Sequence, residues 1–198
     1  MNYYRNHVTQ TSWKQLQNLA QNYLFILIGG WAVWLYTNQL KSKDIDIIVE
    51  FDQLEKLKVN FPLSKNDRLK KYEIVQAEVQ IDIYVPHYSQ LGLPIPTITS
   101  HTTLLEGFRV PTPEILLLLK QTAHTHRSGT PKGRKDLLDI TSLLCLPQFN
   151  WPDYSKLASP DQKQHLAQII RSQTSLPELN LNPHQFSRLK KICLSHLC

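Results

Sequence analysis

Three aspartates in two apolar segments have the residue type and spacing to carry chemistry. Asp44 and Asp46 stand on alternate residues of the segment 43–49, and Asp82 stands in the middle of the segment 79–85. Because strand side chains point to opposite faces with period two, Asp44 and Asp46 share one face while the isoleucines between them face the core. Three converging carboxylates need a cation between them, and hard oxygen ligands select Mg²⁺ or Mn²⁺. The pattern predicts metal-assisted phosphoryl or nucleotidyl transfer.

A glycine pair precedes these carboxylates. Gly29 and Gly30 follow the apolar run 24–28 and stand at the start of an expected helix. Since glycine has no side chain, the backbone N–H groups at that helix start can approach phosphates closely, and the helix dipole adds a favourable field. We therefore expect this turn to bind the phosphates of a nucleotide.

The elements that must position these residues alternate between helix and strand. Apolar residues at helical spacing predict a first helix that begins near Thr11. Strands are expected at 23–28, 44–50, 69–75 and 78–85, and helices at 31–40 and 51–59. The last two strands are expected to pair through a tight connection at Gln76 and Ala77. A short hairpin or edge strand is expected within 97–110.

The C-terminal part of the chain is predicted to be helical. A helix is expected to open at Thr112-Pro113-Glu114, and further helical stretches at 160–171 and 183–197. Between them, the Gly- and Pro-containing segment 127–135 is expected to be a basic loop. We predict an α+β fold, with a small mixed β-sheet flanked by helices and a C-terminal helical region. The expected domains are a catalytic core at 1–110 and a helical region at 111–198.

Composition fits a small enzyme without a membrane segment. A chain of 198 residues suits one domain, or one domain with a helical appendage. Its formal net charge of +6 favours a polyanionic partner. Cys145, Cys193 and Cys198 have no paired framework and no metal-ligand spacing, so we expect reduced thiols in a cytoplasmic protein. We expect no signal peptide and no membrane span, since no apolar run approaches about 20 residues.

The ordered combination of Gly29-Gly30, Asp44-Ile45-Asp46 and Asp82 resembles the DNA polymerase beta-like nucleotidyltransferase superfamily. Its signature is a Gly-Gly or Gly-Ser turn, a spacer holding one helix, an Asp-x-Asp strand and a later third Asp. The resemblance implies a metal-dependent nucleotidyltransferase that binds an NTP such as ATP. The chain departs from the pattern at Gly30, where Ser is frequent, and at Lys43, where Ser or Thr often precedes the first Asp.

A second, looser motif lies further along the chain. Lys120 on an expected helix, followed by a basic segment and Lys-Asp-x-x-Asp at 135–139, looks like the toxin-type nucleotidyltransferases of abortive-infection and toxin–antitoxin systems. In that group the lysine contacts nucleotide phosphates and the Asp of Lys-Asp helps to organise the site. These roles fall on Lys120 and Asp136, and Arg127 and Lys43 are further candidates for phosphate contact. A lysine that snorkels from a core helix is the alternative for Lys120.

The mechanism implied by the resemblance is two-metal transfer of a nucleoside monophosphate from an NTP. Asp44 and Asp46 would bridge two Mg²⁺ ions, and Asp82 would bind the ion that activates the attacking hydroxyl and would accept its proton. Lys120 would neutralise charge on the leaving pyrophosphate.

The sequence leaves three alternatives for the acceptor of the nucleoside monophosphate. The first is a macromolecule, either the 3′ end of tRNA or a hydroxyl of a partner protein, in a toxin–antitoxin system. The second is a small molecule of the aminoglycoside kind, which the six Lys and Arg residues against one acid between Arg109 and Lys135 disfavour. The third is a non-catalytic antitoxin or binding module. In the first reading Lys132, Arg134 and Lys135 contact RNA. The alternative for these three residues and for Arg127 is a solvated loop.

Two residue pairs are assigned structural roles. His124 and His126 are two residues apart on an expected helix, so they point in different directions and cannot share a metal as an i, i+4 pair could. A surface or helix-end role is expected for them. Trp31 and Trp34 are expected to pack against the sheet rather than to stack on a base.

Overall fold

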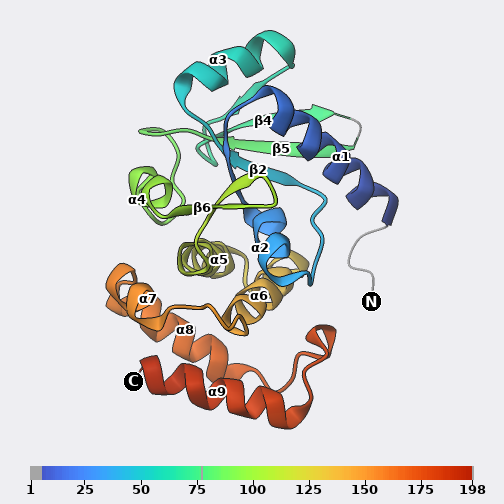
Figure 1. Cartoon of the computed structure of the whole chain (residues 1–198). Helices are drawn as coiled ribbons and strands as arrows, with labels where there is room; N and C mark the ends of the chain where they lie inside the picture. The colour runs from blue at the N-terminus through green and yellow to red at the C-terminus, as the bar shows by residue number, and fades with distance from the viewer. Residues whose placement is uncertain (1–5, 77, 198) are drawn as a thin grey trace. The chain divides into compact units, whose positions relative to one another are not determined.

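The computed structural model of the protein describes residues 6–76 and 78–197. The chain divides between Thr112 and Pro113 into two compact units, which we call the sheet unit and the helical unit (Figure 1). Part of the expected Gln76-Ala77 connection, at Ala77, lies outside the described residues.

A five-stranded mixed sheet is the framework of the sheet unit. The strand order is β1-β2-β5-β4-β3. β2 runs parallel to β5, and every other neighbouring pair in this sheet is antiparallel. The predicted α+β fold with a small mixed sheet is confirmed. The strands are β1 (Ile26–Ile28), β2 (Ile45–Ile48), β3 (Ser64–Asn66), β4 (Lys71–Gln76) and β5 (Val79–Tyr84).

Isoleucines form one face of this sheet. Ile45 pairs with Ile81, which pairs with Ile74 across the next strand, and Ile47 pairs with Ile83. All five side chains are fully buried. Since the side chains alternate, the acidic residues between the isoleucines project from the opposite face.

Helices and one hairpin complete the sheet unit. They are α1 (Asn6–Asn22), α2 (Gly29–Thr37), α3 (Phe51–Asn60), α4 (Ile95–Ser100) and the hairpin of β6 (Thr102–Leu105) with β7 (Phe108–Pro111). The expected hairpin within 97–110 is thus present, preceded by an unexpected helical turn. The predicted start of the first helix near Thr11 is wrong, because the Thr11 hydroxyl lies inside α1 and donates to the carbonyl of His7 instead of capping the helix.

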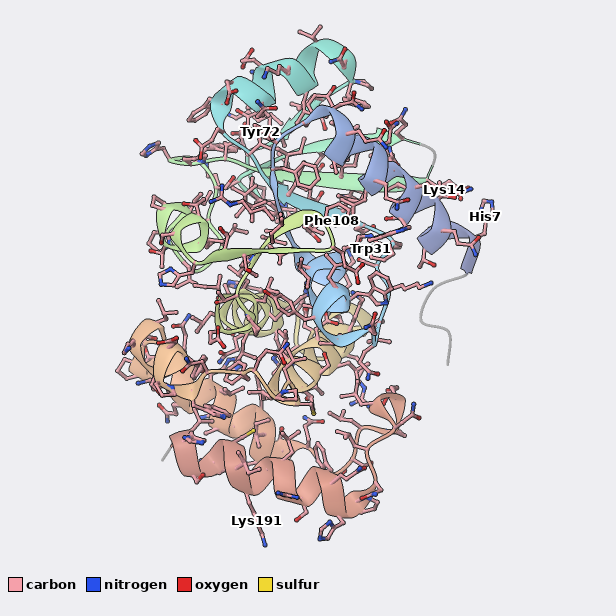
Figure 2. All side chains as sticks on the ribbon, in the orientation of Figure 1. His7, Lys14, Trp31, Tyr72, Phe108 and Lys191 are labelled. Atoms are coloured by element: carbon pink, nitrogen blue, oxygen red, sulfur yellow. The ribbon has the colours of Figure 1, made fainter. Side chains whose placement is uncertain are left out.

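The tryptophans belong to an aromatic cluster. Trp31 is 1% exposed, and its indole N–H donates to Ser12 Oγ at 2.9 Å. The rings of Trp34 and Trp13 lie 5.4 and 5.0 Å from the Trp31 ring, and Phe108 lies 5.6 Å from Trp13. Figure 2 labels Trp31 of α2 and Phe108 of β7, two members of this cluster. Trp31 is therefore a buried packing residue, and its partners in this cluster lie on α1 and on α2 itself.

The helical unit consists of α5 (Pro113–Arg127), α6 (Pro131–Leu144), α7 (Trp151–Leu157), α8 (Pro160–Ser172), the short 3₁₀ helix η1 (Pro177–Leu179) and α9 (Pro183–Leu197). The prediction of a basic loop over 127–135 is wrong for most of its length, because α6 already begins at Pro131. Thr130 accepts a hydrogen bond from the Gly133 N–H at 3.1 Å, and Pro131 occupies the first turn, where its fixed φ favours a helix start.

The structure also bears on the cysteines and on the expected absence of a membrane span. Cys145 and Cys193 carry free thiols, whereas Cys198 lies outside the described residues. Among the helices that the structure describes, none combines the length and apolar character needed to cross a bilayer.

Candidate functional site

The candidate site is built on the polar face of the sheet, where the strand register brings acids side by side. Asp46 on β2 pairs with Asp82 on β5, and Asp82 pairs with Glu73 on β4. Neighbouring strands lie about 4.8 Å apart and residues in register share a face. On the other side of β2, Asp46 pairs with Ile28, the last residue before the glycine turn. Asp44 lies two residues before Asp46, just ahead of β2.

The glycine turn lies directly against Asp46. Gly29 has a φ of +70°, and a Cβ placed on it would lie 2.0 Å from Asp46 Oδ2. Glycine is therefore required both by the left-handed backbone and by the close approach of the carboxylate. Gly29 and Gly30 are also the first residues of α2, whose preceding residue Ile28 provides no side-chain cap. The partial positive charge of this helix start thus lies beside an acid of the site.

The third carboxylate is held by a lysine that we did not predict. Lys71 Nζ lies 2.6 Å from Asp82 Oδ2 and 2.9 Å from Glu73 Oε1. Gln80 donates to the other Asp82 oxygen at 2.8 Å, and Asn66 donates to Glu73 at 3.0 Å. The Lys71 side chain is only 8% exposed. Lys71 and Glu73 therefore form, with Asp82, a largely buried ionic cluster.

The charge of this lysine is maintained by its partners. Burial acts to lower the pKa of Lys71, but its hydrogen bonds to Asp82 and Glu73 outweigh burial and raise that pKa above its ordinary value. The hydrogen bond from Lys71 likewise lowers the pKa of Glu73 against the opposing effect of burial. Lys71 is therefore a permanent cation at neutral pH.

The alternation of charged residues with Tyr72 and Ile74 along β4 is the sequence signal that could have identified Lys71 and Glu73 as site residues. Lys71 and Glu73 alternate with Tyr72 and Ile74 in the same manner as the aspartates alternate with isoleucines on β2. In a strand that pairs with β5, both would be expected on the face of Asp82.

The donor chemistry of the aspartates is the type that binds a divalent cation. Asp44 and Asp46 offer carboxylate oxygens, the ligand type that Mg²⁺ and Mn²⁺ prefer. Asp82 is the third carboxylate, and its two oxygens accept hydrogen bonds from Lys71 and Gln80. Across residues 6–76 and 78–197, no set of three or more His, Cys, Asp or Glu side chains is arranged to hold a metal ion.

The predicted site residues of the second motif lie in the helical unit. Lys120 Nζ on α5 lies 2.7 Å from Asp139 Oδ2 and 3.5 Å from Asp136 Oδ1, both on α6. The Lys120 side chain is 8% exposed and the two carboxylates are almost fully buried. Lys135 adds a second ammonium 3.7 Å from Asp139. These residues form a buried ionic cluster that joins α5 to α6.

The basic residues near this cluster are also paired with acids. Arg127 makes a two-pronged contact with Asp136, in which Nη2 donates to Oδ1 at 2.9 Å. Arg134 on α6 contacts both oxygens of Glu178. Lys132, in the first turn of α6, is exposed. The expectation of a solvated basic loop that presents four cations is thus replaced by helix residues, of which Arg127, Arg134 and Lys135 contact acids of the same unit.

A histidine pair lies beside the helical cluster. The rings of His124 on α5 and His165 on α8 are 5.8 Å apart. Burial lowers the pKa of His124, an effect that Asp136 opposes and Arg127 reinforces. Burial and the neighbouring His124 lower the pKa of His165. His126 is exposed, so the expected helix-end surface role holds for His126, whereas His124 is partly buried.

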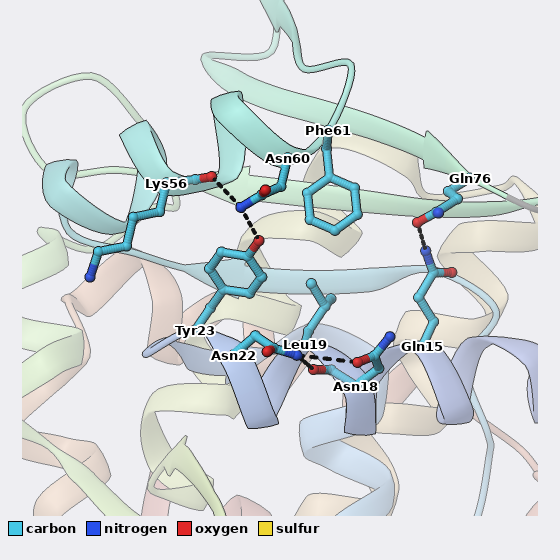
Figure 3. A pocket seen from close by; sticks show the side chains of 9 residues that line it. All are labelled: Gln15, Asn18, Leu19, Asn22, Tyr23, Lys56, Asn60, Phe61 and Gln76. Atoms are coloured by element: carbon cyan, nitrogen blue, oxygen red, sulfur yellow. Dashed lines mark hydrogen bonds between the residues drawn. The ribbon is translucent and has the colours of Figure 1, made fainter.

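A cavity of about 400 Å³ lies elsewhere in the sheet unit, between α1, α3 and the end of β4 (Figure 3). Gln15 of α1 donates there to Gln76 of β4 at 2.8 Å, and Asn60 donates to the Tyr23 hydroxyl. Gln76 alternates with Val75 and so shares the face of Ile74. The cavity therefore opens on the isoleucine face, opposite Asp46 and Asp82.

No protein-family model matches the chain, and no curated protein matches it. Among solved structures, the chain is similar to JHP933 from Helicobacter pylori, with a TM-score of 0.54 and 16% identity over 96% of this chain and 93% of that one. It is similar to an H. pylori protein described as a candidate nucleotidyltransferase, with a TM-score of 0.55 and 15% identity over 98% and 96% of the two chains.

A third similar structure is an antigenic nucleotidyltransferase-like protein from Paracoccidioides brasiliensis. The TM-score is 0.50 and the identity 19%, over 93% of this chain and 92% of that chain. At such identities the likeness establishes the fold. The chain therefore has the nucleotidyltransferase fold that the motif of Gly29, Asp46 and Asp82 led us to expect.

Proposed function

We propose that the protein is a nucleotidyltransferase that transfers a nucleoside monophosphate from an NTP to an acceptor hydroxyl. The observation that carries this proposal is the position of Asp46, which lies against Gly29 at the start of α2 and in register with Asp82. A helix start is the type of element that binds phosphates, and a carboxylate is the type of ligand that holds a divalent cation, so their closeness supports the proposal.

The chain's own residues would have separate roles in this transfer reaction. The backbone N–H groups at Gly29 and Gly30 bind the phosphates, helped by the positive end of α2. Asp44 and Asp46 would hold Mg²⁺ or Mn²⁺, which when bound supplies charge neutralisation on the triphosphate. Lys43, directly before Asp44, is a candidate for a further phosphate contact.

The second motif is proposed to serve the same reaction. By their resemblance to the toxin-type motif, Lys120 would contact the leaving phosphates and Asp136 would organise the site. Arg127, which contacts Asp136 in the helical unit, would act with it on the phosphates. These roles rest on the motif.

The proposed acceptor is a macromolecule, with the 3′ end of tRNA tested first and a hydroxyl of a partner protein second. The net charge of +6 favours a polyanion. A role in a toxin–antitoxin system is proposed on the resemblance of the second motif alone.

A label-transfer assay tests the proposal. The chain is incubated with Mg²⁺, total tRNA and each of the four NTPs labelled at the α-phosphate, and the label on RNA and on protein is counted. We expect transfer by the wild type and by Asp52→Asn, whose side chain is 66% exposed on α3, and loss of transfer in Asp46→Asn. Equal transfer by Asp46→Asn and the wild type would refute the assignment. Label on protein alone would move the acceptor from RNA to protein.

A further inference from the structure

We propose that Lys71 takes the place of a second metal ion, so that the site holds a single divalent cation at Asp44 and Asp46, and Asp82 is a positioning residue rather than a metal ligand. This inference rests on the proposed function, and it assigns a role to a lysine that the motif does not contain.

Both oxygens of Asp82 are engaged by side chains of β4 and β5. Asp82 is the middle member of a row of three acids in register, with Asp46 on one side and Glu73 on the other. Lys71 Nζ lies 2.6 Å from one Asp82 oxygen, and Gln80 donates to the other at 2.8 Å. Both donors lie on the antiparallel pair of strands β4 and β5. The Asp82 carboxylate therefore binds side chains of this strand pair, and not a metal ion held jointly with Asp46 of β2.

Lys71 balances the charge of two neighbouring acids. Lys71 touches two carboxylates at once, Asp82 and Glu73, and its side chain is 8% exposed. A row of three acids needs cations to offset the repulsion between like charges. One ammonium already offsets the charges of Asp82 and Glu73 together. A dication bound to Asp82 would also lie beside the Lys71 ammonium, where poorly screened repulsion opposes it.

The Lys71 ammonium is held in the site by its two acidic partners. Lys71 Nζ lies 2.6 Å from Asp82 Oδ2 and 2.9 Å from Glu73 Oε1, and the Lys71 side chain is 8% exposed. Removal of one partner of a buried, hydrogen-bonded ion pair leaves the other charge uncompensated. Displacement of Lys71 by a metal would require the ammonium to find new partners within the sheet unit. Lys71 is therefore a permanent part of the site, and a metal ion does not displace its ammonium group.

The experiment counts bound Mn²⁺ on the full-length chain by the loss of the free-ion signal in electron paramagnetic resonance. We expect the wild type to saturate with a single Mn²⁺ per chain, and Asp82→Asn to bind that ion with unchanged affinity. Lys71→Met should gain a second ion, because Asp82 and Glu73 are then uncompensated, and Lys71→Met/Asp82→Asn should return to one. Lys65→Met, at a lysine paired with Asp67 and 48% exposed, is the matched control and should resemble the wild type.

Two outcomes would overturn the inference even if Lys71→Met failed to fold. They are saturation of the wild type with two Mn²⁺ ions, and a large loss of Mn²⁺ affinity in Asp82→Asn. The proposed function fails in a different way. In that case Asp46→Asn would leave both Mn²⁺ binding and label transfer unchanged, whatever the behaviour of the Lys71 variants.

Discussion

Gly29 and Asp46 approach each other so closely that no side chain fits between them. A Cβ on Gly29 would lie 2.0 Å from the Asp46 Oδ2 atom and 2.8 Å from the Asp46 Cβ. The glycine comes from the turn that opens α2, and the aspartate from β2, which pairs with β1. This contact sets the position of a carboxylate relative to a helix start, which is the relationship that the proposed nucleotide chemistry requires.

Gly29→Ala should therefore be more damaging than an alanine at another left-handed glycine. Gly107 has a φ of +84°, and a Cβ added to it would meet no atom within 4 Å, so Gly107→Ala incurs only backbone strain of about 1–2 kcal/mol. Gly29→Ala adds a steric clash that costs about 1–3 kcal/mol more, and it should also reduce label transfer by displacing Asp46. Urea unfolding and the transfer assay measure both effects. Equal losses in the two variants would show that the contact with Asp46 is unimportant.

Removal of the first carboxylate should abolish transfer without unfolding the chain. Asp44→Asn keeps the size of the side chain but removes a charged ligand, and we expect the single-turnover rate to fall by about 10²-fold or more. The thermal melt should change little. Glu50→Gln, an exposed acid directly before α3, is the control and should keep wild-type transfer. Wild-type rates in Asp44→Asn would remove Asp44 from the mechanism.

Lys120→Ala should destabilise the helical unit, whatever its effect on chemistry. The variant leaves Asp139 and Asp136 with less compensation in a site where both are almost fully buried, and loss of one partner of a buried pair costs about 3–5 kcal/mol. Lys156→Ala breaks an exposed pair with Asp153 and should cost less than about 1 kcal/mol. Urea unfolding of the two variants makes the comparison.

The double variant Lys120→Met/Asp139→Asn separates structure from catalysis. It removes both charges and should recover part of the lost stability. If transfer activity returned together with stability, Lys120 would have only a structural role. If stability returned and the chemical step stayed about 10²-fold slower, Lys120 would act on the leaving phosphates as proposed.

Stability should fall in mild acid because of the histidine pair. The pKa values of His124 and His165 are below the ordinary 6.5 in the folded chain, mainly through burial. As the pH falls through 6.5, the unfolded chain therefore binds protons before the folded chain does, and the free energy of unfolding decreases until the folded-state pKa values are passed. Urea unfolding between about pH 7.5 and about pH 5.5 measures this slope.

The double variant His124→Gln/His165→Gln should flatten that pH dependence. His184→Gln, at an exposed position in the first turn of α9, should leave it unchanged. An identical slope in the wild type and the double variant would assign the acid sensitivity to other groups.

The positions of the first motif followed from local sequence alone. Asp46 and Asp82 alternate with isoleucines, and a period of two places acids and isoleucines on opposite faces whatever the strand order. The glycine pair could be placed at a helix start for a similar reason, since it lies between an apolar strand and an apolar helix. Such patterns depend only on residues a few positions apart, which is why the fold class could be predicted.

Local sequence did not predict the helix boundaries that depend on capping residues. The segment 127–135 contains glycine and proline, which suggested a loop, but Pro131 is at the first turn of α6 and Thr130 caps it. Thr11, by contrast, has the type of a capping residue and lies inside α1. Each of these residue types suits two positions at a helix start or end, and the composition of the segment does not choose between them.

The charge partners were decided only by the tertiary structure. Lys71 meets Asp82 because β4 and β5 pair in one particular register, and a register shifted by one residue would have turned Lys71 to the isoleucine face. Lys120 meets Asp139 because α5 packs against α6. The sequence by itself determined which residues are acids on the polar face of a strand. Which cation balances each acid depended on pairing and packing between segments that local periodicity does not connect.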